Sequence, residues 1–231
     1  MEVSVSVFLL AVALGQTPPV ANEMHERFQA VTRIREHLIQ GELAPAKLLA
    51  KDLTDAKPLE GTPKGWVPFM ESMSNAAVGL EAATDMEGAT MALARVSSAC
   101  ADCHVAHDGG PGLGRMRSIP PQKWSEGENM PLHLWAVDWM WLGLVAPSEE
   151  AWERGTGELR AVPLAKMFEG GNPAAELLEA QVYALAKEGA LMGEERRGER
   201  TAIMGKMLAT CAACHALRDA GTVKAPATPS P

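Results

Sequence analysis

The sequence predicts an all-α protein built as two tandem four-helix bundles. Alanine, leucine, methionine, glutamate and the long basic residues dominate the 231-residue chain, and these residues favour helices. The chain also repeats itself, because residues 24–31 align with residues 130–137 at an offset of 106 residues. Glycine and proline interrupt both copies at similar intervals, which divides each copy into four helical segments.

The first repeat is expected to span residues 22–118. Asn22 is a candidate N-cap for its opening helix, and Gly41 is suited to end that helix. A loop rich in proline and glycine separates its second and third helices. The four helices are expected over residues 23–40, 44–53, 66–84 and 88–107.

The second repeat is expected to span residues 128–220, after a linker at 119–127 that continues a stretch rich in glycine and proline. Residues 221–231 are rich in alanine, proline, threonine and serine, and are expected to be disordered. Helices with one apolar stripe cannot bury it alone, so a bundle is the economical arrangement. The four helices of this repeat are expected over residues 130–145, 149–167, 173–192 and 199–218.

The N-terminus resembles a secretory signal peptide over residues 1–15. Residues 3–14 form an apolar run too short to cross a bilayer, and small residues suited to cleavage follow it. The segment departs from the usual pattern because it carries Glu2 and no basic residue. No other segment has the length and hydropathy of a transmembrane helix, and the net charge of −8 argues against nucleic acid as a partner.

Two copies of a C-x-x-C-H motif, Cys100–His104 and Cys211–His215, use every cysteine in the chain. This pattern attaches c-type haem, because two thiols one helical turn apart add to the two vinyl groups of the porphyrin. The adjacent imidazole then reaches the iron from the same side, so His104 and His215 are expected as proximal ligands. The sequence thus predicts two covalently bound haem c groups (iron protoporphyrin IX), tethered by Cys100, Cys103, Cys211 and Cys214.

Three other uses of the cysteines are open. An exported protein can form disulfides, four cysteines can bind one structural zinc ion, and each pair can act as a redox-active dithiol. None of these explains why a histidine follows the second cysteine of both motifs, so haem attachment is the favoured interpretation.

The position of the motifs indicates which residues surround each haem. No methionine follows Met207, so the pocket at Cys211 must come from residues that precede the motif. Both repeats resemble class II cytochromes c, the cytochrome c-prime type, over nearly all of residues 22–220. The resemblance rests on the two motifs and on the helices that open with Met24 and Met130; the short loop between the second and third helices and the fusion of two units depart from it. It implies a four-helix bundle with the haem motif near the end of the last helix and a distal residue from the first helix.

Helix periodicity ranks the candidates for the distal ligand. Met24 and Met130 lie on the apolar stripe of their helices at matching places, although each could equally be a core methionine that fills a gap. His133 lies near the same stripe and is the main rival in the second repeat. Its counterpart Arg27 cannot bind iron and is expected beside a haem propionate, whereas His25 could reach the iron only if the first turn unwinds.

Further residues are expected around the haems or in the core. The residues one turn before each motif should line the proximal side of the pocket, or belong to the ordinary core; they are Leu93, Val96, Met204 and Met207. Trp135 and Trp139 make the helix over residues 130–145 apolar on nearly every side. We expect this helix to pack against the first repeat or against a second copy of the chain, which would form a homodimer.

These observations predict an electron carrier rather than an enzyme. The protein is expected in the bacterial periplasm, where it would exchange electrons with periplasmic or membrane-bound redox proteins. The alternative implied by the resemblance is a five-coordinate haem protein that binds or senses NO or CO. A haem-free helical protein and a peroxidase are weaker alternatives. A peroxidase would need an acid–base group at its distal site, and only His133 and Arg27 hint at one.

Overall fold

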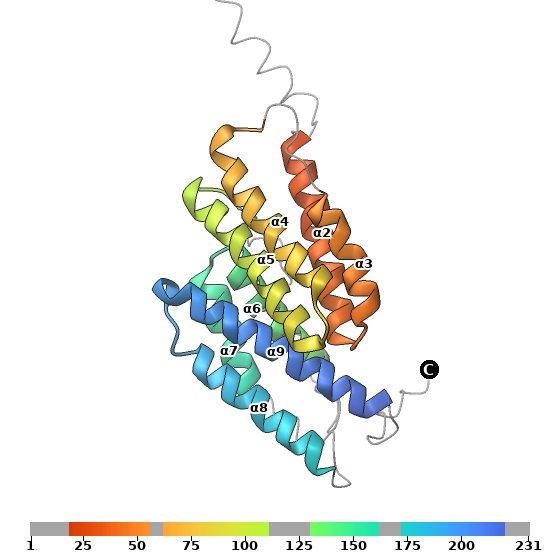
Figure 1. Ribbon diagram of the computed structural model, residues 1–231. Helices are drawn as coiled ribbons and strands as arrows, with labels where there is room; N and C mark the ends of the chain where they lie inside the picture. The colour runs from red at the N-terminus through yellow and green to blue at the C-terminus, as the bar shows by residue number, and fades with distance from the viewer. Residues whose placement is uncertain (1–18, 56–61, 111–129, 162–171, 220–231) are drawn as a thin grey trace, which may run out of the picture.

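A computed structural model describes residues 19–55, 62–110, 130–161 and 172–219 (Figure 1). These residues form eight α-helices and two short 3-10 turns, with no strand among them, so the predicted all-α class is confirmed. No helix within these ranges combines the length and the apolar character needed to cross a bilayer. The predicted signal peptide at 1–15, linker at 119–127 and tail at 221–231 lie outside the described residues.

The first four helices are α2 (Pro19–Ile39), α3 (Leu43–Thr54), α4 (Val67–Ala82) and α5 (Met86–Ala106), and a 3-10 turn (Lys64–Trp66) precedes α4. Each helix packs on the next, and α5 returns to contact α2. The predicted N-cap at Asn22 is wrong, because α2 begins one turn earlier at Pro19. Proline suits the first turn of a helix, where its missing N–H has no intrahelical partner.

The last four helices are α6 (Met130–Val145), α7 (Glu149–Ala161), α8 (Pro173–Gly189) and α9 (Arg197–Asp219), with a 3-10 turn (Glu194–Arg196) before α9. They follow the same contact order, since α6 packs on α7, α7 on α8, α8 on α9 and α9 on α6. Helix α6 has the predicted bounds, and the predicted continuation of α7 to residue 167 lies outside the described residues.

Local sequence signals explain several helix ends. The Asp85 carboxylate accepts a hydrogen bond from the Gly88 N–H at the start of α5, and the Asn172 side chain accepts one from Ala174 N–H at the start of α8. At the end of α2, Gly41 adopts a φ of +80°, a left-handed conformation that favours glycine. These residues therefore fix where the helices begin and end.

Helices α5 and α9, which carry the two C-x-x-C-H motifs, cross near the middle of the molecule (Figure 1). Gly205 of α9 lies so close to α5 that a Cβ atom there would be 3.1 Å from the Cα of Met91. Farther along the pair, Arg197 Nε lies 4.0 Å from the Asp102 carboxylate, so the two helices run in opposite directions. The two motifs therefore lie towards opposite ends of the crossed pair.

One continuous hydrophobic core extends through both halves of the chain and includes residues from all eight helices. Helix α6 is buried on nearly every side and contacts α5 of the first repeat as well as α7 and α9, which confirms the prediction for this helix. Arg35 of α2 also donates a hydrogen bond of 2.6 Å to the Asp138 carboxylate of α6. The two repeats consequently fold against each other rather than as separate units.

Candidate haem-binding sites

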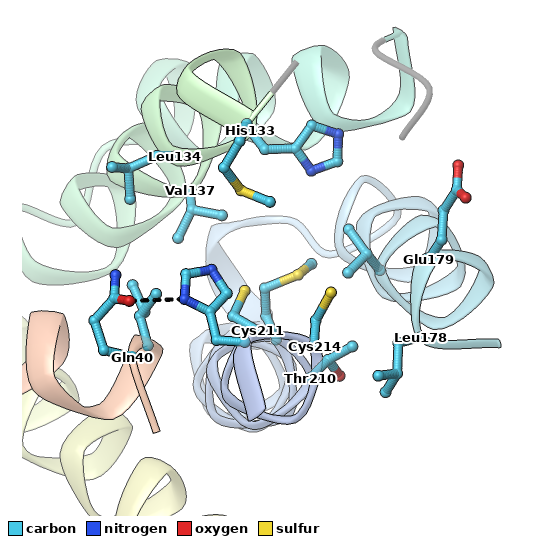
Figure 2. A pocket seen from close by; sticks show the side chains of 14 residues that line it. Gln40, His133, Leu134, Val137, Leu178, Glu179, Thr210, Cys211 and Cys214 are labelled. Atoms are coloured by element: carbon cyan, nitrogen blue, oxygen red, sulfur yellow. Dashed lines mark hydrogen bonds between the residues drawn. The ribbon is translucent and has the colours of Figure 1, made fainter. Parts of the chain in front are cut away.

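The second motif lines a cavity of about 210 Å³ between α6, α8 and the last turns of α9 (Figure 2). The Cys211 and Cys214 side chains point from α9 towards the space between α6 and α8. Leu134 lines the cavity and is 45% exposed, so the cavity reaches the surface there. Its apolar lining is formed by Ile39, Met130, Leu134, Val137, Leu178, Val182 and Met207.

Most residues predicted for the second site lie around this cavity. Met130 and His133 of α6 face it across from the two cysteines, and Met207 lies one turn before the motif on α9. Met204 is fully buried in the core and is not among the lining residues. The structure thus brings both distal candidates to the second motif.

His215 is almost completely buried, with 8% of its surface exposed. Its Nδ1 atom lies 2.9 Å from the side-chain oxygen Oε1 of Gln40, which follows the end of α2 (dashed line in Figure 2). A carbonyl oxygen accepts hydrogen bonds and cannot donate them, so this pairing requires the proton on Nδ1. The lone pair of the imidazole is then on Nε2, the atom that would bind a metal.

The first motif occupies the last turns of α5 and has a similar arrangement. Nδ1 of His104 lies 2.8 Å from the backbone oxygen of Val145, at the end of α6. Gly110 passes over the imidazole with a φ of +121°, and a Cβ atom there would lie 3.2 Å from Cγ and Nδ1 of His104. A backbone oxygen can only accept, so His104 also carries its proton on Nδ1.

The distal side of the first motif carries charge. Arg27 is buried and forms an ion pair with Glu23 on the same helix. It is close enough to Cys100 to favour the thiolate there, so it lies towards the first motif. Met24, one helical turn before Arg27, is half-buried. His25 is exposed, and its ring lies 2.8 Å from the Gln29 amide nitrogen. The turn that carries His25 is helical, so the unwinding that would bring this side chain to the iron is not seen.

Burial raises the pKa of the thiols of Cys100, Cys103 and Cys211. Burial, reinforced by the neighbouring Cys103, raises the pKa of Cys100 from 9.0 to about 11, against a smaller lowering effect of Arg27. Burial and Cys214 raise the pKa of Cys211 to about 12, and burial also raises the pKa of Cys103. A reactive dithiol needs an accessible thiolate, so these environments disfavour a redox-active pair.

The arrangement of the cysteines also bears on the other interpretations. All four cysteines are described by the structure, and none forms a disulfide. Among the described residues, no group of three or more histidine, cysteine, aspartate or glutamate side chains gathers in a way that could hold a metal ion. A single zinc site that draws on both motifs is therefore unsupported.

Some pocket residues were not anticipated from the sequence. Leu178 and Val182 of α8 line the cavity, and the expectation that the third helix of a bundle faces the fourth could have found them. Gln40 and the Val145 carbonyl had no sequence signal, because each comes from the repeat opposite to the histidine it contacts. Leu93 and Val96, predicted near the first motif, are fully buried core residues.

No protein-family model matches the sequence, and comparison with curated proteins and solved structures likewise gives no match. The chemistry of the two motifs and the residues around them therefore carries the functional argument.

Proposed function

We propose that this protein is an exported dihaem c-type cytochrome of the bacterial periplasm, made of two tandem four-helix bundles that each bind one haem c on the last helix. The observation that carries the proposal is the cavity at the second motif, where Cys211, Cys214 and His215 face Met130 and His133. Two thiols, an imidazole and candidate distal ligands around one apolar space form the donor set that a covalently bound haem needs.

The residues of the first motif support a second haem of the same kind. Cys100, Cys103 and His104 occupy the matching end of α5, and Nδ1 of each motif histidine donates to an oxygen acceptor. Such an acceptor orients the ring and presents Nε2 to a metal, as is usual for metal-binding histidines.

When bound, each haem would supply reversible one-electron exchange at its iron, and the protein would set its ligation, polarity and accessibility. The apolar side chains around Cys211 would exclude water from the porphyrin, while exposed Leu134 lies where the cavity opens to partners. The net charge of −8 favours redox partners with a basic docking surface. Export is inferred from the N-terminal sequence, which resembles a signal peptide. It agrees with the proposed haem attachment, because haem c is attached outside the cytoplasm.

A five-coordinate haem that binds NO or CO is the second candidate, and one observation favours it at the first motif. Arg27 occupies the position that His133 has in the second repeat, and a guanidinium cannot bind iron. If Met24 does not reach the iron, the distal position of the first haem is available to a gas.

Intact mass and a pyridine haemochrome assay on protein produced with the haem-attachment machinery test the proposal. We expect the mass of two haems above that of the mature polypeptide and a c-type haemochrome with two haems per chain. A mass equal to that of the amino acids alone would overturn it. The oxidised optical spectrum separates the two candidates, because low-spin bands favour electron transfer and high-spin bands favour gas binding.

A further inference from the structure

The two motif histidines are held reciprocally by the opposite repeats. His215 of the second repeat contacts Gln40 at the end of α2, the first helix of the first repeat. His104 of the first repeat contacts Val145 at the end of α6, the first helix of the second repeat. Each candidate proximal ligand is thus oriented by the helix that opens the other repeat.

The two acceptors differ in kind although both lie at the end of the helix that opens a repeat. Helix α2 ends in a Schellman motif, in which the Glu42 N–H donates to His37 O at 2.8 Å and the Gly41 N–H donates to Leu38 O at 3.0 Å. Gln40 is the C-cap of this motif, and its amide reaches across to α9. At the end of α6 the Ser148 N–H donates to Gly143 O at 3.1 Å, which makes Ala146 the equivalent C-cap residue.

The Ala146 side chain has no acceptor atom, and His104 contacts the backbone carbonyl of the preceding residue, Val145. A backbone carbonyl at a helix end has a nearly fixed position and strength. The Gln40 amide is on a rotatable side chain, and its strength as an acceptor can be changed by substitution. Only the second site therefore has an adjustable partner for its proximal ligand.

We propose that Gln40 is a positioning residue for the second haem, which orients His215 from the first repeat and tunes the reduction potential of that haem. This inference rests on the proposed function, since it requires a haem at the second motif. A stronger acceptor at Nδ1 gives the imidazole more anionic character and makes it a better donor to the iron. Better donation favours the oxidised iron and lowers the potential.

Three variants of the full-length holoprotein test this role in optical redox titrations. Gln40→Glu places a carboxylate at Nδ1 and should lower the potential of the second haem. Gln40→Leu removes the acceptor and should raise it. Gln29→Leu is the matched control, because Gln29 lies on α2, the helix that Gln40 caps, and contacts the exposed His25 rather than a motif histidine.

Changes to groups that orient metal ligands commonly alter metal affinity by about 10- to 100-fold. We expect at least a tenfold change in the ratio of oxidised to reduced iron, or ~59 mV for one electron. The potential of the first haem and both potentials of Gln29→Leu should remain at the parental values. A variant with alanine at Cys211 and Cys214 should lack the second haem. The potential that is missing from its titration belongs to that haem.

Opposite shifts in the two Gln40 variants cannot arise from a general loss of packing, which would move both in one direction. Unchanged potentials, or shifts of the same sign, in variants that retain both haems would overturn the role of Gln40 and leave the proposed cytochrome intact. A parent protein without haem would overturn both proposals.

Discussion

The two C-x-x-C-H sites share a scaffold but differ in the groups that surround them. At each site the motif ends a long helix, faces the first helix of its own repeat and has its histidine held by the opposite repeat. The distal side of the first site carries the buried Arg27–Glu23 ion pair. The distal side of the second site carries His133 and Met130 around an apolar cavity.

The two halves of the chain therefore have the same order of helix contacts but different side chains around their motifs. Helical pattern and packing tolerate many side chains of similar volume, whereas a ligand position requires a particular donor atom. Two haems with different distal surroundings would have different potentials and hence a preferred direction of electron flow.

The largest expected effect is the loss of one haem without loss of the other. Replacing Cys211 and Cys214 with alanine should reduce the haem content from two to one per chain, because in the proposed cytochrome each cysteine pair would tether its own porphyrin. Intact mass and the pyridine haemochrome measure the change. The matched variant lacking Cys100 and Cys103 should lose the other haem; if either pair removed both haems, the sites would not be independent.

A change of spin state should follow from removal of a distal ligand. Met130 and His133 both face the cavity at Cys211, and one of them is the expected distal ligand. One of the two variants Met130→Ala and His133→Ala should therefore convert the second haem to the high-spin form. Met24→Ala should do the same at the first site, where Arg27 offers no ligand. Optical and EPR spectra of the oxidised protein report the conversion, with His25→Ala as the control. Two unaltered low-spin haems in all three variants would show that the distal ligands come from elsewhere.

The repeats also differ in how closely their first two helices approach, and this predicts a stability effect. A Cβ at Gly155 of α7 would lie 2.5 Å from the backbone nitrogen of Met140, so α6 and α7 pack through glycine. Helix α3 of the first repeat instead buries Ala46 and Ala50. Gly155→Ala should destabilise the protein by about 1–3 kcal/mol in urea unfolding. Gly157→Ala is the matched control.

Apart from its chain neighbours and the nearby backbone of its own helix, no atom lies within 4 Å of a Cβ at Gly157, so alanine there should be neutral or stabilise the helix by up to about 1 kcal/mol. Equal destabilisation by the two substitutions would show that the close contact between α6 and α7 is not specific to Gly155.

The smallest expected effect is a difference in the alkaline stability of the haem-free chain. The folded-state pKa values of Cys100 and Cys211 are raised from 9.0 to about 11 and about 12, so folding favours the neutral thiols. This stability is fully present below pH 9 and is lost as the pH rises towards the folded-state values. Urea unfolding at pH 8 and at higher pH measures the loss.

Alanine at either cysteine should reduce the alkaline loss, and the effect should be larger for Cys211 than for Cys100. The difference of about one pKa unit corresponds to roughly 1.4 kcal/mol at most. An alkaline loss that is the same in the parent and both variants would assign it to other groups.

Much of the fold could be predicted from the sequence because its signals are local. Breaks at glycine and proline located all eight helices, and the bounds of α6 were predicted without error. The start of α2 was placed too late because Asn22 is a good N-cap residue in isolation, whereas Pro19 extends the helix by one turn. The motif residues were likewise readable, since their spacing lies within one helical turn.

The chain sequence alone was sufficient for the all-α class, the repeat and the two C-x-x-C-H motifs, because each depends on residues that are neighbours or periodic along the chain. The crossing of α5 and α9, the cavity at Cys211 and the exchange of Gln40 and Val145 between repeats required the folded structure. These contacts join residues far apart in sequence, and the packing of the shared core, rather than any local preference, sets their geometry.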